Sequence, residues 1–423
     1  MVAQRPLRIA TLAHGHPSLS AGGAEVSAYA LHRAFAADPH LAALHISCVP
    51  KGVKLLPQVD EIGVSTADLH PLSLVRSDPR GHDGLGTALR EFRPDVVHFH
   101  HVLGFGADAP LALRKLLPDA VIVLTLHEYI TICHRQGQML KTDGQLCHRS
   151  DPEACAFCFP DRSAGSFLRR ERSLQTLLEA VDAFVAPSAF LADRYVEWGI
   201  GADRIAVIEN LLAEPAIPMP VIRPRHGDLA FFGQINPFKG VDVLLEAVIM
   251  LSDDDWRGRH LHIHGSGLEH QASEYRARFA ALLERCGARV TVHGPYDNGE
   301  VGRLMSAVEW IVVPSVWWEN SPVVIQEAFR ADRPVIGSNL GGIAEKVRDG
   351  VNGLLFRVGD ARDLALALKR SGDSGLMASL RVAPNATTES IKAAHLALYR
   401  GRHSARLDVL PIAGYAAAPQ PAI

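Results

Sequence analysis

The sequence predicts an α/β protein of two doubly wound domains, each with a parallel sheet covered by helices on both faces. Short apolar segments of strand length alternate with amphipathic segments of helix length along the whole chain. The length of 423 residues exceeds what one core commonly holds and favours two domains of roughly 200 residues each. A proline-rich stretch near the middle separates two such series of strands and helices.

The predicted strands are apolar throughout, which is typical of parallel strands buried on both faces. In the first series they are Ile9–Ala13, Ile46–Val49, Val96–His100, Val121–His127, Ala183–Pro187 and Ile205–Ile208. In the second series they are Ala230–Gly233, Leu261–Gly265, Val290–Gly294, Trp310–Pro314 and Val335–Gly337. Segments between them carry a helical apolar face, as in Val241–Leu251.

The domain boundaries follow from composition. Residues 213–227 contain four prolines and little periodicity, so we expect a linker there. This predicts an N-terminal domain over residues 1–212 and a C-terminal domain over 228–400. Residues 401–423, rich in Ala and Pro, are expected to form a flexible tail. Ligands should bind in a cleft between the domains, at the carboxyl ends of the strands.

The composition excludes some classes of function. A formal net charge of −3 gives no electrostatic reason to expect nucleic acid binding. The apolar runs are too short to span a membrane, and the N-terminus enters a strand without the features of a signal peptide. We therefore expect a cytoplasmic protein with reduced thiols, and the oligomeric state stays open.

The stretch WIVVPSVWWENSPVVIQE, from Trp310 to Glu327, is the most informative part of the chain. It predicts a strand, a polar turn that carries Glu319, and a helix with Pro322 at its first position. Glu327 would then lie about two turns into that helix. Carboxylates beside a helix N-terminus suit a polyhydroxylated ligand, because the amides can hold phosphate and the carboxylates can accept from hydroxyls.

Other strand ends of the second half offer groups of the same kind. FFGQINPFKG places Gln234 and Lys239 after a strand, and a lysine there can stabilise the charge of a departing diphosphate. HIHGSG ends a strand with Gly265, where the backbone can approach a phosphate closely. HGPYDNGEV places Tyr296 where a base could rest on its ring.

In order and spacing, these segments resemble the donor-binding domain of the retaining, nucleotide-sugar-dependent glycosyltransferases of family 4. The fold of that family is GT-B, two Rossmann-like domains that face a cleft. The resemblance implies that Glu327 accepts the ribose hydroxyls and that Glu319 faces the sugar ring. It places the backbone amides of Asn320 and Ser321 near the sugar and phosphates, and it assigns the diphosphate to Lys239.

The chain departs from the family pattern at Gln234, where the family usually has an arginine that grips the same phosphates. A glutamine can donate a hydrogen bond but brings no charge. Charge-assisted hydrogen bonds contribute roughly 1.5–3 kcal/mol, against about 1 kcal/mol for neutral ones. We therefore expect weaker stabilisation of the leaving group.

The first half agrees with this resemblance. Gly22 and Gly23 lie between the first strand and a helix, like the glycine-rich loop of the family that touches diphosphate or acceptor. His127 ends a strand at the position where the family has a histidine beside the transferred sugar. Three further histidines at a strand end are interpreted as lining of the cleft: His98, His100 and His101.

An insert over residues 133–158 gathers four of the six cysteines: Cys133, Cys147, Cys155 and Cys158. Thiolates in loops, with one C-x-x-C pair, suit a structural zinc ion. An iron–sulfur cluster is the competing metal centre, and packed reduced thiols or a stress-formed disulfide are the alternatives without metal. A metal here would be structural, since four thiolates leave no open position for chemistry.

The basic segment Phe167–Leu178 carries Arg169, Arg170 and Arg172 on a predicted helix. It would suit a peripheral contact with anionic lipids at the inner face of the membrane, or be a solvated helix face.

The resemblance implies a retaining transfer of a sugar from a UDP- or GDP-sugar to an acceptor hydroxyl, with no cofactor needed for catalysis. The acceptor would be a glycan or a lipid-linked molecule in the synthesis of cell-surface polysaccharide or lipid-linked glycan. Two alternatives remain: a nucleotide-sugar epimerase on the same fold, and a non-catalytic protein that binds a nucleotide-sugar.

Overall fold

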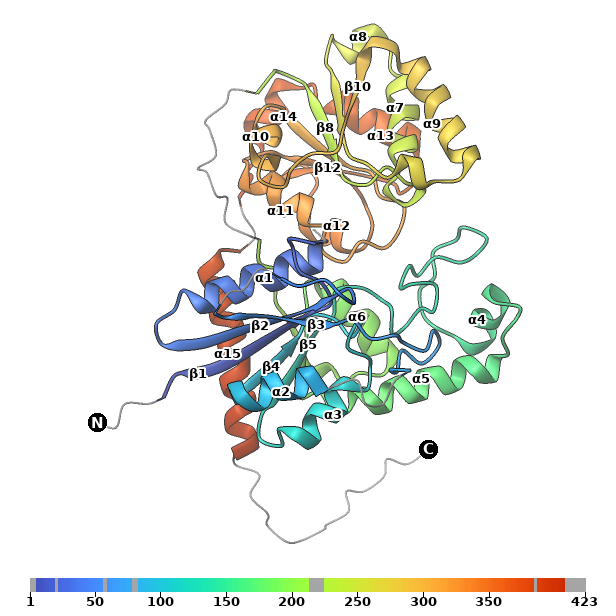
Figure 1. Cartoon of the computed structure of the whole chain (residues 1–423). Coiled ribbons are helices and arrows are strands. Elements are labelled where there is room, and N and C mark those ends of the chain that lie inside the picture. The colour runs from blue at the N-terminus through green and yellow to red at the C-terminus, as the bar shows by residue number, and fades with distance from the viewer. Residues whose placement is uncertain are drawn as a thin grey trace, which may run out of the picture.

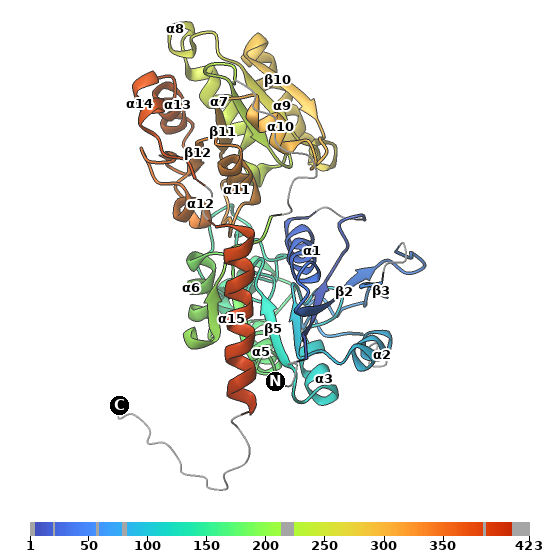
Figure 2. The ribbon, with the colours of Figure 1, turned by 90° about the vertical axis from the view of Figure 1, so that its left-hand side faces the viewer.

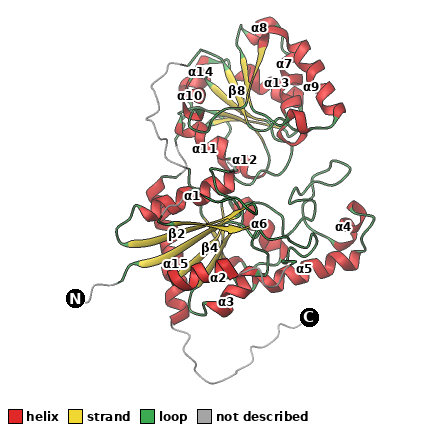
Figure 3. Cartoon of the chain, viewed as in Figure 1, coloured by secondary structure: helices red, strands yellow, loops and turns green. Residues whose placement is uncertain are grey.

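The computed structural model describes residues 5–19, 22–55, 59–77, 83–212, 224–383 and 386–407. Two domains lie one above the other, and each contains one parallel sheet (Figure 1). Helices cover both faces of each sheet (Figure 3). The predicted α/β architecture of two doubly wound domains is confirmed.

The N-terminal domain has a seven-stranded sheet in the order β3-β2-β1-β4-β5-β6-β7. Its strands are β1 (Leu7–Ala13), β2 (Leu41–Val49), β3 (Glu61–Ser65), β4 (Val96–Phe99), β5 (Val121–Thr125), β6 (Ala183–Ala186) and β7 (Ile205–Val207). Its helices are α1 (Gly23–Ala36), α2 (Asp83–Phe92), α3 (Ala109–Leu116), α4 (Pro152–Cys158), α5 (Ala164–Leu178) and α6 (Ala189–Trp198), with the 3₁₀ turn η1 (Ala202–Arg204).

The C-terminal domain has a six-stranded sheet in the order β10-β9-β8-β11-β12-β13. Its strands are β8 (Leu229–Phe232), β9 (Leu261–His264), β10 (Val290–Gly294), β11 (Trp310–Val313), β12 (Val335–Ser338) and β13 (Gly353–Phe356). Its longer helices are α7 (Val241–Met250), α9 (Ser273–Cys286), α11 (Val323–Arg330) and α13 (Ala361–Arg370). Its shorter helical segments are η2 (Pro237–Lys239), α8 (Asp253–Trp256), η3 (Leu268–His270), η4 (Gly287–Arg289), α10 (Val301–Ser306), α12 (Gly341–Lys346) and α14 (Ser374–Ser379).

Both sheets reverse their strand order at one point, between β1 and β4 in the first domain and between β8 and β11 in the second. The connections that follow these two strands run in opposite directions. The loops at the carboxyl ends of the strands therefore separate and form a crevice in which a ligand can bind. The loops after β8 and β11 carry Lys239 and Glu319. The topology therefore brings the two predicted site segments together.

Two predicted features differ from the structure in detail. The edge strands β3 and β13 were not predicted, because each contains a glycine and is apolar over too short a stretch to stand out. Helix α11 begins at Val323 with Pro322 as its N-cap, so Glu327 lies just beyond the first turn and not two turns along.

The C-terminal helix α15 (Thr388–Leu407) overturns the predicted boundary at residue 400. It runs along the N-terminal domain, where it contacts α1 and β5 (Figure 2). Ile391, Leu396 and Tyr399 are buried there in one apolar cluster with Ile9 and Val121. The helix completes the covering of the first sheet, because its apolar face has no other surface to pack against. Residues 401–407 are therefore helical, while the rest of the predicted tail (408–423) and residues 213–223 of the predicted linker lie outside the described residues.

Tyr399 also makes a buried polar contact between α15 and the sheet. Its hydroxyl lies 2.6 Å from Nδ1 of His98, whose Nε2 is 2.7 Å from Oγ1 of Thr125. His98 and Tyr399 are fully buried. Each polar group therefore depends on the other for its hydrogen bond.

We predict that Tyr399→Phe destabilises the protein by about 1–3 kcal/mol, because it leaves Nδ1 of His98 buried without a partner. Tyr275→Phe is the matched control, since the Tyr275 hydroxyl is buried and has no hydrogen-bond partner in the described structure. Urea unfolding of both variants provides the measurement. Equal stability of the two variants would contradict the role given to Tyr399.

Candidate active site between the domains

The turn between β11 and α11 holds a buried carboxylate. Only 8% of Glu319 is exposed. Its Oε1 accepts from Lys239 Nζ at 2.6 Å, from Ser315 Oγ at 2.7 Å and from Trp317 Nε1 at 2.9 Å. Burial alone would raise the pKa of Glu319, but the charge of Lys239 and these hydrogen bonds outweigh burial and lower it. The carboxylate is therefore ionised at neutral pH.

All three donors use the same oxygen of Glu319. Its other oxygen, Oε2, has no hydrogen-bond partner among the described residues. A carboxylate oxygen accepts hydrogen bonds readily. The arrangement thus fixes the orientation of the carboxylate through one oxygen and leaves the other to accept from a ligand hydroxyl.

The loop after β8 is held against this turn by its local structure. Asn236 caps the 3₁₀ turn η2 by accepting from the backbone amides of Phe238 and Lys239. The next residue, Gly240, has a φ of 65°, and a side chain there would collide with the carbonyl oxygen of Pro314. Only glycine permits this close approach. It sets the distance at which Lys239 reaches Glu319.

Glu327 has a different environment. Burial raises its pKa to about 7, while the charge of Arg330 lowers it by less. No hydrogen bond to its carboxylate is present among the described residues. Tyr296 lies close enough for the charge of Glu327 to act on it, and burial together with that charge raises the pKa of Tyr296 to about 12. The two predicted donor-binding residues therefore share one region.

Two other predicted donor-site residues have different settings. Gln234 is exposed, and its Oε1 accepts from Asn236 Nδ2 at 3.2 Å. Gly265 donates its amide to the carbonyl of Gly294, and a side chain at Gly265 would collide with the carbonyl of Gly233. The structure gives Gly265 a role in close packing of neighbouring strands, and its amide is already used.

The first domain meets the Glu319 turn at His127. Asn320 Nδ2 donates to the backbone carbonyl of His127 at 2.6 Å, and this bond crosses the domain boundary. The His127 ring is 3.2 Å from the ring of His100, measured from Nε2 to Nδ1. Burial lowers the pKa of His127 to about 3, with a further contribution from His101. His127 is therefore neutral and can exchange hydrogen bonds with a ligand but not neutralise its charge.

Gly22 and Gly23 lie where the first helix faces the second domain. Gly22 is the N-cap of α1 and supplies no side-chain cap to its first amides. A side chain at Gly23 would contact Val323, the first residue of α11, at 3.5 Å. The N-termini of α1 and α11 therefore approach each other across the boundary. That of α11 brings partial positive charge, while the buried carboxylate of Glu25 already lies at that of α1.

Of the HFHH histidines interpreted as cleft lining, His98 lies instead in the interior of the first domain, whereas His100 stacks on His127 and His101 lines a small cavity with His127. His98, His100 and His101 are all buried. His98 bonds to Thr125 and Tyr399, and His101 Nε2 lies 3.0 Å from Glu128 Oε1.

Glu209 joins the domains and was not predicted from the sequence. Its Oε1 accepts from Ser321 Oγ at 2.6 Å and from Gln326 Nε2 at 2.9 Å. Its Oε2 forms an ion pair with the buried Lys346. No local motif surrounds Glu209, and its partners lie more than a hundred positions away in the chain. Only the tertiary structure could reveal this network.

Two further contacts across the boundary were also missed. Glu345 accepts from the amides of Ala189 and Phe190, both at 3.0 Å, so a carboxylate of one domain caps helix α6 of the other. Trp318 Nε1 donates to the carbonyl of Cys147 at 2.9 Å, and its ring joins the apolar core of the first domain. The cysteine-containing insert therefore contacts the residue beside Glu319.

The four cysteines of the insert do not meet as metal ligands. Their side chains share one region, since burial and then the neighbouring Cys133, Cys147 and Cys158 raise the pKa of Cys155 to about 11. Yet no three of these sulfurs lie within 4.8 Å of one another. In the described part of the chain, they are free thiols. The geometry therefore lends no support to a zinc or iron–sulfur site, which stays a prediction.

Arg170 is not part of a basic surface as predicted. It is buried, and its guanidinium donates to the backbone carbonyls of Ile130, Thr131 and Ile132. It thereby holds the segment that follows His127, while Arg169 and Arg172 remain exposed. Of the helices described, none has the length and apolar character needed to cross a lipid bilayer.

Two family models match the chain. The model described as Glycosyltransferase Family 4 matches residues 21–212, and the one described as Glycosyl transferases group 1 matches residues 226–372. A D-inositol 3-phosphate glycosyltransferase of Nocardioides sp. is 30% identical over 221 residues, which are 46% of this chain and 47% of that protein. A glycogen synthase of Mycobacterium tuberculosis is 28% identical over 70% of this chain and 64% of that protein. The chain thus spans about half to two thirds of the length of these relatives.

Solved structures with the same fold cover nearly the whole chain. Sucrose-phosphate synthase from Thermosynechococcus elongatus has a TM-score of 0.66 at 19% identity, over 94% of this chain and all of that chain. Anabaena Alr3699/HepE, solved in complex with UDP and glucose, has a TM-score of 0.61 at 16% identity, over 95% of this chain and 97% of that chain. These similarities confirm the predicted GT-B fold.

The raised pKa of Glu327 predicts a pH-dependent cost in stability. An unfolded glutamate titrates near pH ~4.3, so between there and about pH 7 the native state keeps a proton that the unfolded chain releases. The stability due to this group is therefore present at low pH and is lost as the pH rises through that window. We predict that Glu327→Gln removes this loss of stability. The unfolding free energy of the variant minus that of the native chain should therefore increase by roughly 1–3 kcal/mol from about pH 5 to pH 8.

Urea unfolding at several pH values measures this difference. Glu284→Gln, at an exposed position of α9, is the matched control and should show no such trend. A constant difference between Glu327→Gln and the native chain across the window would mean that Glu327 titrates normally.

Proposed function

This chain belongs to the glycosyltransferases of family 4, and on that premise we propose that it transfers a sugar from a nucleotide diphosphate sugar to an acceptor hydroxyl. The observation that carries the proposal is the convergence of Lys239 and Glu319 at the carboxyl ends of β8 and β11, opposite His127. Lys239, the cation for the diphosphate, donates a hydrogen bond to Glu319, the oriented carboxylate for the sugar.

The donor would lie along the Glu319 turn. Glu327, which has no hydrogen-bond partner among the described residues, accepts the two ribose hydroxyls, and Tyr296 lies on the side of the base. Oε2 of Glu319 accepts from a sugar hydroxyl, and the neutral His127 approaches the sugar from the other domain. A relative of the same fold is solved with UDP and glucose, which supports a donor of this class.

Lys239 would stabilise the departing diphosphate. The bond between the anomeric carbon and the phosphate oxygen breaks, and the bond to the acceptor oxygen forms. Negative charge develops on the diphosphate, where Lys239 and the N-terminus of α11 oppose it. The acceptor proton passes to the departing phosphate oxygen. The ion pair of Lys239 with Glu319 holds the lysine in place before the donor arrives.

Transfer with retention of the anomeric configuration is the expected outcome, as in the family that the Glu319–Glu327 spacing resembles. The departing diphosphate and the incoming acceptor oxygen then lie on the same face of the sugar ring. That geometry requires the acceptor to approach from the first domain, on the side of His127 and Trp318.

A polar cavity of about 210 Å³ in the first domain is our candidate for part of the acceptor site. Its lining includes the charged residues Arg149, Glu171 and Arg194. His148, which also lines it, packs edge-on against Trp318, one residue before Glu319. These groups suit a hydroxylated, charged acceptor. A polysaccharide precursor or a lipid-linked glycan has that chemistry, and the exposed Arg169 and Arg172 would suit an anionic membrane surface.

We predict that Lys239→Met lowers kcat by about 10²–10³-fold with the correct donor, because it removes the charge that stabilises the leaving group. Lys369→Met is the control, since it removes the same charge from an exposed pair with Asp255. Initial rates with a panel of UDP- and GDP-sugars provide the measurement. If both variants keep native rates, the leaving group is stabilised elsewhere.

We also predict that the product keeps the anomeric configuration of the donor. Proton NMR of the first product formed, before equilibration, reads this directly from the anomeric coupling. An inverted product would exclude the retaining reaction. Conversion of the donor to an epimer without any acceptor would favour an epimerase, and tight donor binding without turnover on any acceptor would favour a binding protein.

A further inference from the structure

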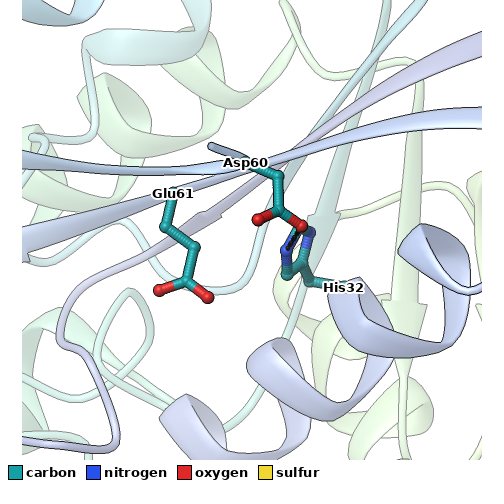
Figure 4. A group of neighbouring side chains, drawn as sticks. All are labelled: His32, Asp60 and Glu61. Atoms are coloured by element: carbon teal, nitrogen blue, oxygen red, sulfur yellow. Dashed lines mark ion pairs between the residues drawn. The ribbon is translucent and has the colours of Figure 1, made fainter. Parts of the chain in front are cut away.

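A second group of titratable side chains lies at the outer edge of the first sheet, away from the Glu319 turn. His32 is on helix α1, and Asp60 and Glu61 are at the start of the edge strand β3 (Figure 4). One ligand atom from each lies within 4.8 Å of the other two. Across the described ranges, this is the one group of three or more possible metal ligands that meets so closely.

The short contacts in this group are not hydrogen bonds. Nε2 of His32 is 3.2 Å from Oδ2 of Asp60, and Nε2 of His16 is 3.2 Å from Oε2 of Glu61. Both nitrogens nevertheless lack a hydrogen-bond partner, because the geometry is unsuitable. Ligands of a tetrahedral ion with bonds of about 2.1 Å are separated by roughly 3.4 Å. The spacing of His32 and Asp60 fits two ligands of one cation, and Glu61 offers a third atom within 4.8 Å of both.

Neighbouring groups orient the candidate ligands. Nδ1 of His16 accepts from the Ser18 backbone amide at 3.2 Å, so its Nε2 carries the proton and points to Glu61 from outside the group. Tyr29 donates to Oε1 of Glu61 at 2.8 Å, which leaves Oε2 toward His16. Metal sites in proteins commonly have such outer hydrogen bonds, which fix the tautomer and the direction of each ligand.

Burial makes the unpaired nitrogens costly without an ion. His32 and His45 have no exposed surface, and neither ring nitrogen of either residue has a hydrogen-bond partner in the described structure. Their rings lie 5.2 Å apart. A buried polar group without a partner costs about 1–3 kcal/mol, and such groups are rare in native proteins. A bound cation would provide the missing partner for a ring nitrogen of His32. His45 lies next to this site and could also bind the ion.

We propose that His32, Asp60 and Glu61 bind a zinc-class divalent metal ion. One imidazole nitrogen and two carboxylates suit zinc, and water would complete the coordination. The ion would fasten helix α1 to the edge strand β3. Helix α1 begins at the Gly22–Gly23 loop, so the metal would stabilise the side of the first domain that faces the donor.

The test is zinc binding to the tag-free full chain in which Cys133, Cys147, Cys155 and Cys158 are all replaced by serine, so that thiols of the insert do not compete. Isothermal titration with zinc chloride alone should give about one equivalent, and zinc should raise Tm. Asp60→Asn in the same background should weaken zinc binding about tenfold or more. Asp68→Asn, which removes the same charge from an exposed position after β3, should bind zinc as the parent does.

Cobalt(II) gives an independent readout, because nitrogen and oxygen ligands lack the intense thiolate charge-transfer band. We expect a weak visible spectrum of bound cobalt without that band. This spectrum should be lost in Glu61→Gln and in Asp60→Asn. Two results would overturn the proposal. One is no zinc binding by the folded chain that lacks the four insert cysteines, and the other is equal zinc affinity of the Asp60→Asn and Asp68→Asn variants.

Discussion

The buried carboxylate of Glu319 is the constraint on which the site depends. A charge removed from water must be paired and hydrogen-bonded, and three donors from two loops meet this requirement at one oxygen. Satisfying that charge brings the loop after β8 to the turn after β11, and the absence of a side chain at Gly240 allows the approach. The same pairing keeps Lys239 extended toward the proposed position of the diphosphate. The ion pair that stabilises this buried carboxylate is therefore also the contact that positions Lys239 for its proposed role.

The residues beside Glu319 connect the site to the first domain. Trp318, Asn320 and Ser321 each contact a group of that domain, namely the carbonyls of Cys147 and His127 and the carboxylate of Glu209. A change in the relative position of the domains would have to break these bonds. The buried pair of Glu209 with Lys346 adds a charge that is costly to expose. Binding of a donor at this turn, as we propose, would therefore be coupled to the position of the domains.

The sequence predicted the fold correctly, and the structure brings the predicted Lys239 and Glu319 segments together, because both follow from local patterns. Apolar strands alternating with helices determine the doubly wound topology. The order of the donor-side segments and the Glu319–Glu327 spacing resembled family 4, and the models described as Glycosyltransferase Family 4 and Glycosyl transferases group 1 both match. The glycine and asparagine turns around Lys239 are equally local.

What could not be predicted depends on contacts between distant segments. The return of α15 to the first domain, the burial of His98 and Arg170, and the Glu209 network all fall in this class. The C-x-x-C spacing suggested a metal, yet the structure brings histidine and carboxylates together instead.

The most direct test of the central claim is a crystal structure of the chain with a nucleoside diphosphate bound. The account predicts that the phosphate oxygens lie within hydrogen-bond distance of Lys239 Nζ and near the N-terminus of α11. The ribose hydroxyls should bond to Glu327. A nucleotide bound elsewhere, with Lys239 and Glu319 still paired as in the free protein, would contradict the assignment of this turn as the donor site.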